Sequence, residues 1–565
     1  MDFNRLLPQN SIRRKIAKKI YNKFIKQYSA EEMMYKKWID KNEPKKSELD
    51  KQRETKFDYN PKISIIVPLY NTPEKFFKEL VISLKKQTYS NWELCLADGS
   101  PKPLEFINRF LNDERIKYSV IGENKGIAGN TNECLKLVTG EYVGLLDHDD
   151  LLPMFSLYEI VKAINDNPEA EFLYSDEDKI ETLKKPRYGV FFKPDPSPYT
   201  LNSANYICHF SIFKKELMDK LKGFRSEYDG SQDFDIVSRA FEETKDIVHI
   251  PKVLYHWRVH QNSTAGNSDS KPYAFEIGKK VIKDHVKRMY GTNVEVDDGL
   301  TPGSYELKYE VIGNPKVSII LELTNADTES TNRIINEVKK STYQNIEIIT
   351  IRNEAISKEI KNVLPEENKN IAYNKAVEIS EGEYFIIFDE NLIQIDRENY
   401  IEHLLGICQD KDVAIVGTKL YNENELVEHA GIIVGMNGSG DFLYKGAPKD
   451  IGTYMQRLTI IHNVTCVYTK YAMIDKKQFE SVKGFDAKEK GIYNHIDFCL
   501  KQIENNKQII INPIIAIKIK ELKDANKDVQ NEEEFIKKWE KEYEKGDIYF
   551  SPNLSKSNTG LSLNI

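Results

Sequence analysis

The stretch Glu141-Tyr-Val-Gly-Leu-Leu-Asp-His-Asp-Asp-Leu-Leu-Pro153 joins a short apolar run to a group of ionisable side chains. Its apolar part, residues 142–146, predicts a buried strand. The ionisable side chains that follow are Asp147, His148, Asp149 and Asp150. Open α/β sheets bind their ligands at the carboxyl ends of the strands, so this position points to a functional site.

The acidic stretch has two interpretations. Asp147 and Asp149 can direct hard oxygen ligands to one point, which suits Mg²⁺ or Mn²⁺, and such an ion often carries substrate phosphates. Alternatively, Asp149 or Asp150 is the N-cap of a helix that begins at Leu151. Short acidic motifs also occur by chance, so the stretch alone leaves both interpretations open.

The composition is that of a folded protein with several domains. The chain has 565 residues, 40% of them hydrophobic, and this length predicts roughly three or four domains. A net charge of -7 argues against nucleic acid as a partner. No run approaches the roughly 18 apolar residues of a membrane span, and residues 1–8 lack a signal-peptide core. The six cysteines are scattered without a Cys-x-x-Cys pair, which predicts reduced core residues of a cytoplasmic protein.

The first 60 residues are basic and predicted to be helical. Apolar residues recur at helical spacing, and lysines and arginines cover most of the remaining surface; the apolar positions are Ile12, Ile16, Ile20 and Phe24. Such a helix can make peripheral contact with the inner face of the cell membrane. The favoured alternative is a helix that packs on the protein itself, because acidic residues soon follow the basic ones.

From Pro61 onward, predicted strands and helices alternate. Strands are predicted at residues 62–70, 92–97 and 116–121, and helices at 74–86 and 129–138. This alternation predicts a parallel sheet with right-handed crossovers. Polar residues follow three of the strands, and we expect them along one edge of the sheet: Asp98, Asn124 with Lys125, and Asp147 with Asp149.

Two later stretches add candidate site residues. Gly230-Ser-Gln-Asp-Phe-Asp235 precedes an amphipathic helix, so Gln232 and Asp233 either cap that helix or present a carboxylate to the cleft. Residues 250–264 bring His256 and His260 near the end of a predicted strand. A tryptophan and an arginine lie between these two histidines, which favours a functional role over a structural one.

Several motifs, in this order, resemble the inverting family 2 glycosyltransferases, which have a nucleotide-diphospho-sugar-binding fold. The motifs are Ser64-Ile-Ile-Val-Pro-Leu-Tyr-Asn71, Ala97-Asp-Gly-Ser100, Glu123-Asn-Lys-Gly-Ile-Ala128, residues 140–150, Tyr174-Ser-Asp-Glu-Asp-Lys179, Gly230–Asp235 and Leu254-Tyr-His-Trp-Arg258. The resemblance covers residues of about 61–265. It is closest to the bacterial branch that builds surface polysaccharide or glycosylates surface proteins.

The resemblance implies a role for each matching position. Pro68 and Tyr70 would border the nucleobase pocket. The donor-binding set would be Pro68, Tyr70, Asp98, Lys125, Asp147 and His148. The metal ligands would be Asp147, Asp149 and His256, with His260 as the less favoured alternative to His256. Asp233 matches the general base. The family often has two aspartates before the Gly-Ser turn, whereas this chain has only Asp98, which could correspond to either of the two.

The reaction chemistry agrees with these roles. Mn²⁺ or Mg²⁺ would stabilise the charge of the leaving diphosphate, and one carboxylate suffices to take the proton of the acceptor hydroxyl. Direct displacement inverts the anomeric centre, whereas no second positioned nucleophile for a retaining route is indicated. The resemblance implies transfer of a hexosyl or deoxyhexosyl group from a UDP- or dTDP-linked sugar. The acceptor would be a glycan, a lipid-linked glycan or a protein in bacterial surface glycan synthesis.

From Pro315 the motifs begin again. Lys316-Val-Ser-Ile-Ile320 echoes Lys62-Ile-Ser-Ile-Ile66, and residues 382–389 echo residues 140–147. Two further pairs agree: residues 341–347 with 87–93, and residues 368–372 with 124–128. A period of about 250 residues indicates a duplicated domain. We therefore predict an α/β protein with two tandem Rossmann-like domains of the nucleotide-diphospho-sugar transferase (GT-A) type and a helical N-terminal extension.

The second copy has lost part of the chemistry. Asp147-His-Asp149 becomes Asp389-Glu-Asn391, which replaces one carboxylate with a neutral amide and predicts weaker metal binding. The second copy is therefore predicted to be inactive or much weakened. Two alternatives are a bifunctional transferase that uses Asp389, Glu390 and Asp497, and a sugar- or nucleotide-binding module without turnover. The predicted units are residues 1–60, 61–300, 301–525 and a charged helix with a loosely held tail, 526–565.

Overall fold

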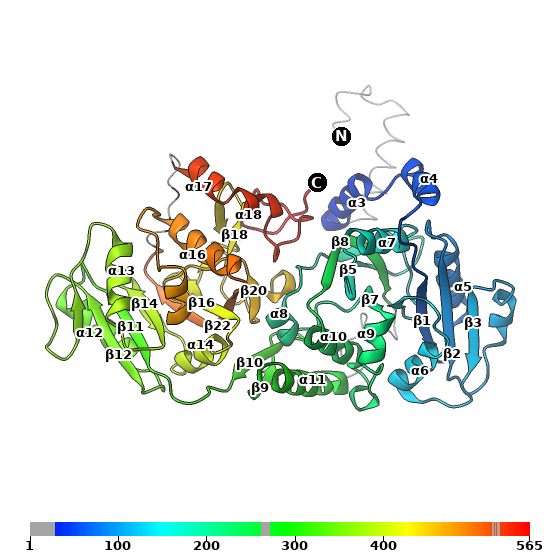
Figure 1. The fold of residues 1–565 in the computed structure, drawn as a ribbon, viewed down its shortest axis with the longest axis horizontal. Coiled ribbons are helices and arrows are strands. Elements are labelled where there is room, and N and C mark those ends of the chain that lie inside the picture. Colours follow the sequence, from blue (N-terminus) through cyan, green and yellow to red (C-terminus); the bar gives the residue numbers. More distant parts are fainter. Residues whose placement is uncertain (1–28, 261–271, 523–524, 526, 528–530) are drawn as a thin grey trace, which may run out of the picture.

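The structure is a computed structural model that describes residues 29–260, 272–522, 525, 527 and 531–565. Two β-sheets with covering helices lie side by side along the longest axis (Figure 1). The basic helix predicted around residues 12–24 lies outside the described residues. Within them, α3 (Ala30–Asn42) and α4 (Lys46–Glu54) precede the first sheet, and Tyr35 and Trp38 of α3 are buried.

The first sheet is parallel in one half and mixed in the other. Its strands are β1 (Ile63–Leu69), β2 (Trp92–Asp98), β3 (Ile116–Val120), β4 (Tyr142–Leu145), β5 (Phe172–Ile180), β6 (Tyr188–Phe191), β7 (Ser211–Lys214) and β8 (Ile247–Arg258). Their order is β3-β2-β1-β4-β7-β5-β6, and β8 also pairs with β5. Strands β1 to β4 pair in parallel, while β7 is antiparallel to both β4 and β5.

Helices of the first unit cover this sheet. They are α5 (Glu74–Lys85), α6 (Gly126–Leu135), α7 (Ser156–Asp166), α8 (Pro198–Ser203), α9 (Lys215–Lys220), α10 (Gln232–Glu243) and α11 (Pro272–Tyr290). α5 buries Phe77, Leu80, Val81 and Leu84, the i, i+3, i+4, i+7 pattern of a helix that packs one face on a sheet. All seven residues of β2 are buried, as expected of a strand covered on both faces.

The helix predicted to begin at Leu151 begins instead at Ser156. Leu151 pairs in an isolated antiparallel bridge with His256, so the chain after Asp150 is extended. The alternative interpretation of Asp149 or Asp150 as a helix N-cap is therefore wrong. α6 begins three residues before the predicted position, directly after the turn at Lys125.

The second sheet repeats the order of the first. Its main strands are β11 (Val317–Glu322), β12 (Ile346–Ile351), β13 (Lys361–Val363), β14 (Tyr384–Asp389), β15 (Leu392–Ile395), β16 (Val413–Tyr421), β21 (Met473–Asp475) and β22 (Gln508–Ile519). The series β3, β2, β1, β4, β7, β5, β8 corresponds to β13, β12, β11, β14, β21, β16, β22. The direction of each pairing is also the same, so the two units share one topology.

Helices and short strands complete the second unit. The helices are α12 (Thr328–Val338), α13 (Lys369–Glu378), α14 (Tyr400–Cys408), α15 (Lys476–Ser481), α16 (Ile492–Glu504), α17 (Glu532–Lys538) and α18 (Glu540–Lys545). The short strands are β17 (Val427–His429), β18 (Ile432–Val434), β19 (Gly440–Phe442) and β20 (His462–Val464). A hairpin of β9 (Val294–Asp298) and β10 (Tyr305–Tyr309) lies between the two sheets in sequence.

The two units contact each other through α8. The backbone N–H of Tyr199 donates to Asn463 Oδ1 (2.9 Å), and the Tyr199 hydroxyl donates to Asp410 Oδ2 (2.9 Å). Tyr454 of the second unit donates to the Phe192 carbonyl (2.9 Å). Figure 1 shows α8 and β20 side by side between the two sheets. One hydrophobic core cluster also contains residues of both units, so the junction is packed.

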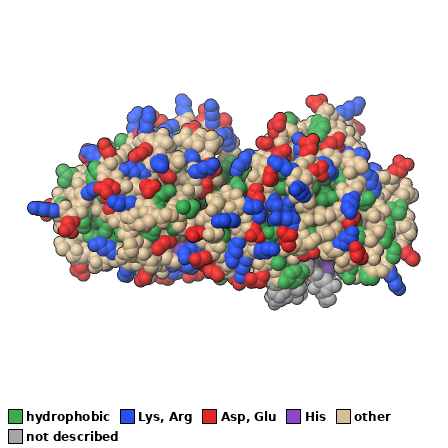
Figure 2. All heavy atoms as spheres, turned by 60° about the horizontal axis from the view of Figure 1, so that its bottom comes forward, with side chains coloured by type: hydrophobic (Ala, Val, Ile, Leu, Met, Phe, Trp, Pro, Cys, Tyr) green, Lys and Arg blue, Asp and Glu red, His purple; other side chains and the backbone are tan. Residues whose placement is uncertain are grey.

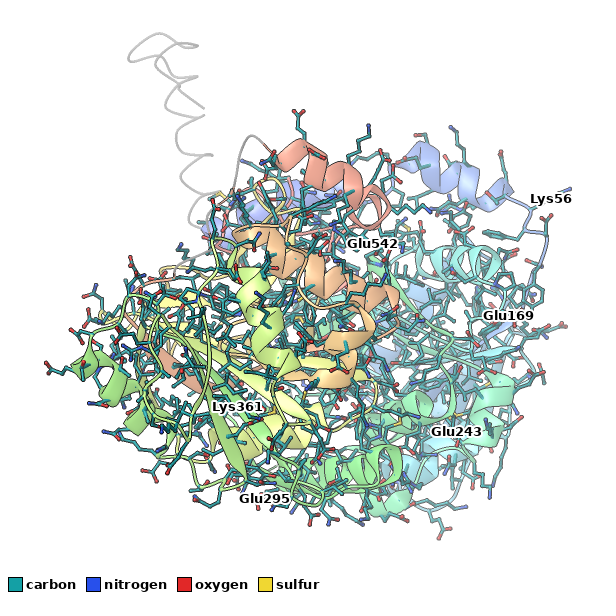
Figure 3. All side chains as sticks on the ribbon, turned by 60° about the vertical axis from the view of Figure 1, so that its left-hand side comes forward. Lys56, Glu169, Glu243, Glu295, Lys361 and Glu542 are labelled. Atoms are coloured by element: carbon teal, nitrogen blue, oxygen red, sulfur yellow. The ribbon has the colours of Figure 1, made fainter. Side chains whose placement is uncertain are left out.

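The C-terminal segment is more firmly held than the predicted loose tail. Phe550 and Leu554 are 2% and 6% exposed, and Asn553 Nδ2 donates to Asp176 Oδ2 of β5 (3.2 Å). Figure 3, which labels Glu542 of α18, shows this segment on the same side of the molecule as the N-terminal helices. Phe550 and Leu554 hold this segment by burying their side chains. Because they stand among charged and polar residues, the sequence pattern did not predict the packing.

The surface and the cysteines agree with the composition. On the face shown in Figure 2, acidic and basic side chains are interspersed over both units. Among the described residues, no helix combines the length and the apolar character needed to cross a membrane. All six cysteines are free thiols and five are buried, as predicted for reduced core residues.

Candidate active site

Strand pairing brings Asp147 and His209 together at one edge of the first sheet. β4 and β7 are antiparallel, with Gly144 opposite Ile212. Continuing this register by three residues places His209 opposite Asp147. Ligand atoms of Asp147, Asp150 and His209 all lie within 4.8 Å of one another. The predicted Asp147 therefore belongs to a three-residue group that could hold a metal ion.

Asp150 is the most constrained member of this group. It is fully buried, Tyr255 donates to its Oδ2 (2.6 Å), and the backbone N–H of Arg258 donates to its Oδ1 (2.6 Å). Burial, together with the negative charges of Asp149 and Asp147, raises the pKa of Asp150 well above its usual value. A cation in the group would offset this repulsion, so the electrostatics of the site fit a bound metal.

His209 is held in place by its neighbours. Its ring stacks on Tyr255 with centroids 4.5 Å apart, and its backbone N–H donates to Glu177 Oε2 (3.3 Å). The fully buried Lys193 donates to the His209 carbonyl and pairs with Glu177 at 3.1 Å. An imidazole fixed in this way is preorganised as a ligand. Sequence reasoning missed His209; the available signal was its place directly before an apolar strand.

The other predicted metal ligands pair elsewhere. Asp149 Oδ2 lies 2.7 Å from His260 Nε2, and His256 Nδ1 lies 2.5 Å from Asp178 Oδ1. The structure therefore does not bring Asp147, Asp149 and His256 to one point. His148 is half-buried between the acidic residues.

Asp233 lies in the first turn of α10, after the N-cap residue Ser231. Asn205 Nδ2 donates to its Oδ2 (3.1 Å). Burial raises the pKa of Asp233, and the charge of Asp147 adds to the rise while that of His209 opposes it. Asp147 and His209 are therefore close enough for their charges to act on Asp233.

The predicted donor-binding residues lie along the same edge but differ in access. Tyr70, just after β1, is 44% exposed, and Pro68 pairs with Ala97 in the adjoining strand. Lys125 Nζ lies 2.8 Å from Glu133 Oε1, and this contact raises the pKa of Lys125. Asp98, in contrast, is fully buried.

The Asp98 carboxylate is already satisfied by its own loop. It accepts hydrogen bonds from the backbone N–H of Ser100 (2.9 Å), the backbone N–H of Leu104 (3.0 Å) and the Tyr118 hydroxyl (2.6 Å). These contacts hold the loop after β2 and leave no exposed oxygen. Contact between this carboxylate and a nucleobase therefore requires the loop to rearrange.

The second unit has a different group at the corresponding edge. Continuing the pairing of β14 with β21 places Lys470 opposite Asp389, where the first unit has His209 opposite Asp147. Lys470 Nζ lies 2.7 Å from Asp389 Oδ2, and Tyr471 donates to Oδ1 (2.5 Å). Burial alone would raise the pKa of Asp389, but the Lys470 charge and these hydrogen bonds lower it overall. An ammonium group thus stands where a metal ligand would be needed.

Comparison with known proteins agrees with this architecture. Residues 64–222 match the family model described as "Glycosyl transferase family 2". The first unit therefore carries a family 2 glycosyltransferase domain at residues 64–222. The corresponding topology of the second unit makes the chain a tandem arrangement of two such α/β folds.

Two curated relatives align over both units. The uncharacterized protein y4gI of Sinorhizobium fredii is 30% identical over 469 residues, which are 78% of this chain and 51% of that protein. The O-antigen biosynthesis protein RfbC of Myxococcus xanthus is 28% identical over 473 residues, 80% of this chain and 37% of that protein. The chain therefore spans about half, or less, of the length of these relatives.

Shorter and more distant matches were also found. WfgD of Escherichia coli, named as a UDP-Glc:alpha-D-GlcNAc-diphosphoundecaprenol beta-1,3-glucosyltransferase, is 39% identical over 95 residues, 16% of this chain and 35% of that protein. A solved structure of S. aureus TarS residues 1–349 in complex with UDP is 24% identical and has a TM-score of 0.33. That match covers 40% of this chain and 65% of the TarS chain.

Proposed function

We propose that this chain is a metal-dependent inverting glycosyltransferase whose active site is the cleft of the first unit. It would move a sugar from a nucleoside-diphosphate donor to a saccharide acceptor in surface polysaccharide synthesis. The observation that carries the proposal is the group of Asp147, Asp150 and His209 beside Asp233. The names of RfbC and WfgD support a saccharide acceptor, and that of WfgD supports a UDP-linked donor.

Asp147, Asp150 and His209 would hold the metal ion. Two carboxylates and an imidazole form a mixed oxygen and nitrogen donor set, which favours Mn²⁺ over the strictly oxygen-bound ions. This set differs from the predicted one in that Asp150 replaces Asp149 and His209 replaces His256. A divalent ion there would supply Lewis-acid stabilisation of the leaving diphosphate.

Asp233 would act as the general base toward the acceptor hydroxyl. Its raised pKa makes the ionised carboxylate a stronger base than an ordinary aspartate, while Asn205 orients one of its oxygens. One base suffices for direct displacement with inversion. Since Lys470 pairs with Asp389, we place the reaction in the first unit alone. A cytoplasmic location, and membrane contact through the basic N-terminal residues, stay predictions.

Donor hydrolysis tests the proposal. The full chain is incubated with UDP- and dTDP-linked sugars in Mn²⁺, Mg²⁺ or EDTA, and released nucleoside diphosphate is measured. We expect metal-dependent release that Asp233→Asn lowers by about 10²- to 10⁴-fold. The matched control in the second unit is Glu390→Gln, which keeps an oxygen acceptor for the backbone N–H of Asn325 and should leave the rate unchanged.

Each alternative has its own outcome in this experiment. Release that persists in EDTA would contradict metal dependence, and a loss caused by Glu390→Gln would move the chemistry to the second unit. If no donor is hydrolysed without acceptor, calorimetry with UDP and with dTDP follows. Metal-dependent binding that Asp147→Ala weakens supports the first-unit site, whereas failure of both nucleotides to bind rejects it. Binding with no transfer to any acceptor would leave a binding module.

A further inference from the structure

A cavity in the second unit takes no part in the proposed reaction. Its volume is about 250 Å³, slightly below the roughly 300–1,000 Å³ of drug-sized ligand pockets and sufficient for a smaller ligand. It lies between the start of α13, the start of α16 and Lys470. Gly491, the residue directly before α16, also lines the cavity.

This cavity corresponds to the active-site cleft of the first unit. Asn368-Lys369 echoes Asn124-Lys125, and Lys470 has the register position of His209. The position in the second unit that corresponds to Asp233 can be found from an i, i+4 ion pair that α10 and α16 share. Asp235 pairs with Arg239 at 2.9 Å in α10, and Asp497 pairs with Lys501 at 2.6 Å in α16. Two residues before these aspartates stand Asp233 in the first unit and His495 in the second.

The residues at these positions no longer provide the transfer chemistry. His495 Nδ1 lies 2.7 Å from the Thr469 hydroxyl, and its ring contacts Tyr468 with centroids 4.3 Å apart. Lys470 is only 3% exposed and neutralises Asp389 at 2.7 Å. Three carboxylates that could hold a metal ion do lie beside the cavity, namely Asp486, Glu489 and Asp497, but Lys538 pairs with all three at 3.4, 2.6 and 2.7 Å.

Three of the five charged residues that line the cavity have ionic partners, and the other two, Glu367 and Lys490, are of opposite sign. Glu489 lies 2.6 Å from Lys538, Lys369 lies 3.4 Å from Glu322, and Lys470 pairs with Asp389. The charged groups that line the cavity therefore have counterions or offset one another in sign. Such a surface favours an uncharged polar ligand over a phosphate or a free metal ion.

The remaining lining residues suit a ligand rich in hydroxyl groups. Asn368, Asn370 and Asn494 line the cavity, and each amide side chain carries both a donor and an acceptor. Asn370 Nδ2 donates to the carbonyls of Asp486 (2.7 Å) and Glu489 (2.9 Å) and to Asn494 Oδ1 (3.0 Å). This network holds the wall of the cavity in place before a ligand arrives.

Two aromatic rings complete the lining. Tyr373 and Phe485 also line the cavity, with ring centroids 6.2 Å apart. Aromatic faces offer apolar area that can pack on the C–H face of a pyranose, while the amides bond its hydroxyls. The cavity therefore combines the two surfaces that a neutral sugar ring presents.

We propose that this cavity binds an uncharged saccharide without a divalent metal, as a holding site for the acceptor glycan. The identification of the ligand as acceptor rests on the proposed function of the first unit. The binding itself does not, because it depends only on residues of the second unit.

Hydrogen exchange on the full chain in EDTA tests the proposal. The probes are glucose, galactose, N-acetylglucosamine, rhamnose and their disaccharides, with UDP and glucose 1-phosphate as charged comparisons. We expect at least one neutral probe to slow exchange in peptides that cover residues 367–373 and 489–495. The first-unit variant Asp233→Asn should keep this protection.

Two exposed lysines two residues apart provide the variant and its control. Lys490 lines the cavity and Lys488 does not. We expect Lys490→Ala to weaken saccharide binding about tenfold, the effect of losing one hydrogen bond from a charged donor, and Lys488→Ala to leave it unchanged. Because both side chains are exposed, neither variant should disturb folding, which thermal melting verifies. Donor hydrolysis without acceptor should be the same in both.

Several results would overturn the proposal. These are protection by UDP or glucose 1-phosphate alone, protection only in first-unit peptides, a requirement for Mn²⁺, or no protection by any neutral probe. Failure of the proposed function would look different. In that case no donor is hydrolysed, yet the second-unit peptides still respond to a neutral saccharide.

Discussion

Strand pairing identifies one of the positions at which the chemistry of the two units differs. In the first unit His209 stands opposite Asp147, and in the second Lys470 stands opposite Asp389. An imidazole can ligate a metal ion together with a carboxylate. An ammonium group cannot, because it has no lone pair and satisfies the carboxylate itself. This difference, together with the replacement of Asp150 by Leu392, explains why the proposed metal group of the first unit has no equivalent at this edge of the second.

At the same scale, we expect His209→Ala to weaken Mn²⁺ binding more than His256→Ala. His209 belongs to the three-residue group, whereas His256 pairs with Asp178. Loss of a ligand should exceed the roughly 10- to 100-fold effect of an outer partner. Calorimetry with Mn²⁺ on the full chain gives both affinities. Equal losses, or a larger loss with His256→Ala, would return the metal site to the set predicted from sequence.

At the level of elements, the Lys470–Asp389 ion pair links the end of β14 to the segment that directly precedes β21. Both side chains are buried, so removing one partner leaves a charge without compensation. We expect Lys470→Met to lower the free energy of unfolding by about 3–5 kcal/mol. The double variant with Asp389→Leu should recover most of this loss. Urea denaturation measures the three values, and an equally unstable double variant would show that the pair is not the cause.

His249 links β8 to β5 and to the loop before α8. Its Nε2 lies 2.9 Å from Asp176 Oδ1 and its Nδ1 lies 3.1 Å from Asp195 Oδ1. Burial lowers the pKa of His249, but the two carboxylates outweigh burial and raise it overall.

This raised pKa determines the sign of a pH effect. The protonated imidazole stabilises the fold fully below the unfolded-state pKa of about 6.5, and this stabilisation is lost as pH rises through the folded-state pKa. We therefore expect the difference in unfolding free energy between the wild type and His249→Gln to shrink with rising pH. Urea denaturation between about pH 6 and pH 9 measures it. A difference that grows with pH would contradict the assigned contacts.

At the scale of the whole molecule, the packed junction between the two units should make them unfold together. Tyr199 is 1% exposed and contacts Tyr290 and Tyr309 of the first unit and its hairpin, as well as Asp410 and Asn463. We expect the wild type to melt in a single transition that Tyr199→Ala separates into two.

The cost of this substitution should resemble that of other large aromatic truncations, roughly 3–5 kcal/mol. Calorimetric melting detects the separation. Tyr59→Ala is the control, since Tyr59 is 45% exposed and surface changes usually stay within about 0.5 kcal/mol. Two transitions already present in the wild type would show that the units are energetically independent.

The α/β class and the duplicated unit could be inferred from the sequence, and the family resemblance pointed to Asp147 and Asp233 as site residues. Apolar runs of strand length followed by turn residues predict β1, β2 and β4 almost to the residue, because strand formation reflects local hydrophobic pattern. Repeated motifs located the second unit for the same reason. Both inferences depend on local sequence patterns, which predict the secondary structure of each stretch without knowledge of its tertiary contacts.

Three features emerge only in the tertiary structure: the group of Asp147, Asp150 and His209, the burial of Asp98, and the Lys470–Asp389 pair. Each depends on which strands become neighbours and in what register, and the partners are far apart in the chain. Register is set by the packing of whole faces, since a slip of one residue would turn every side chain to the other side of the sheet. The sequence therefore supplied the carboxylates, and the antiparallel pairing of β4 with β7 selected the histidine that joins them.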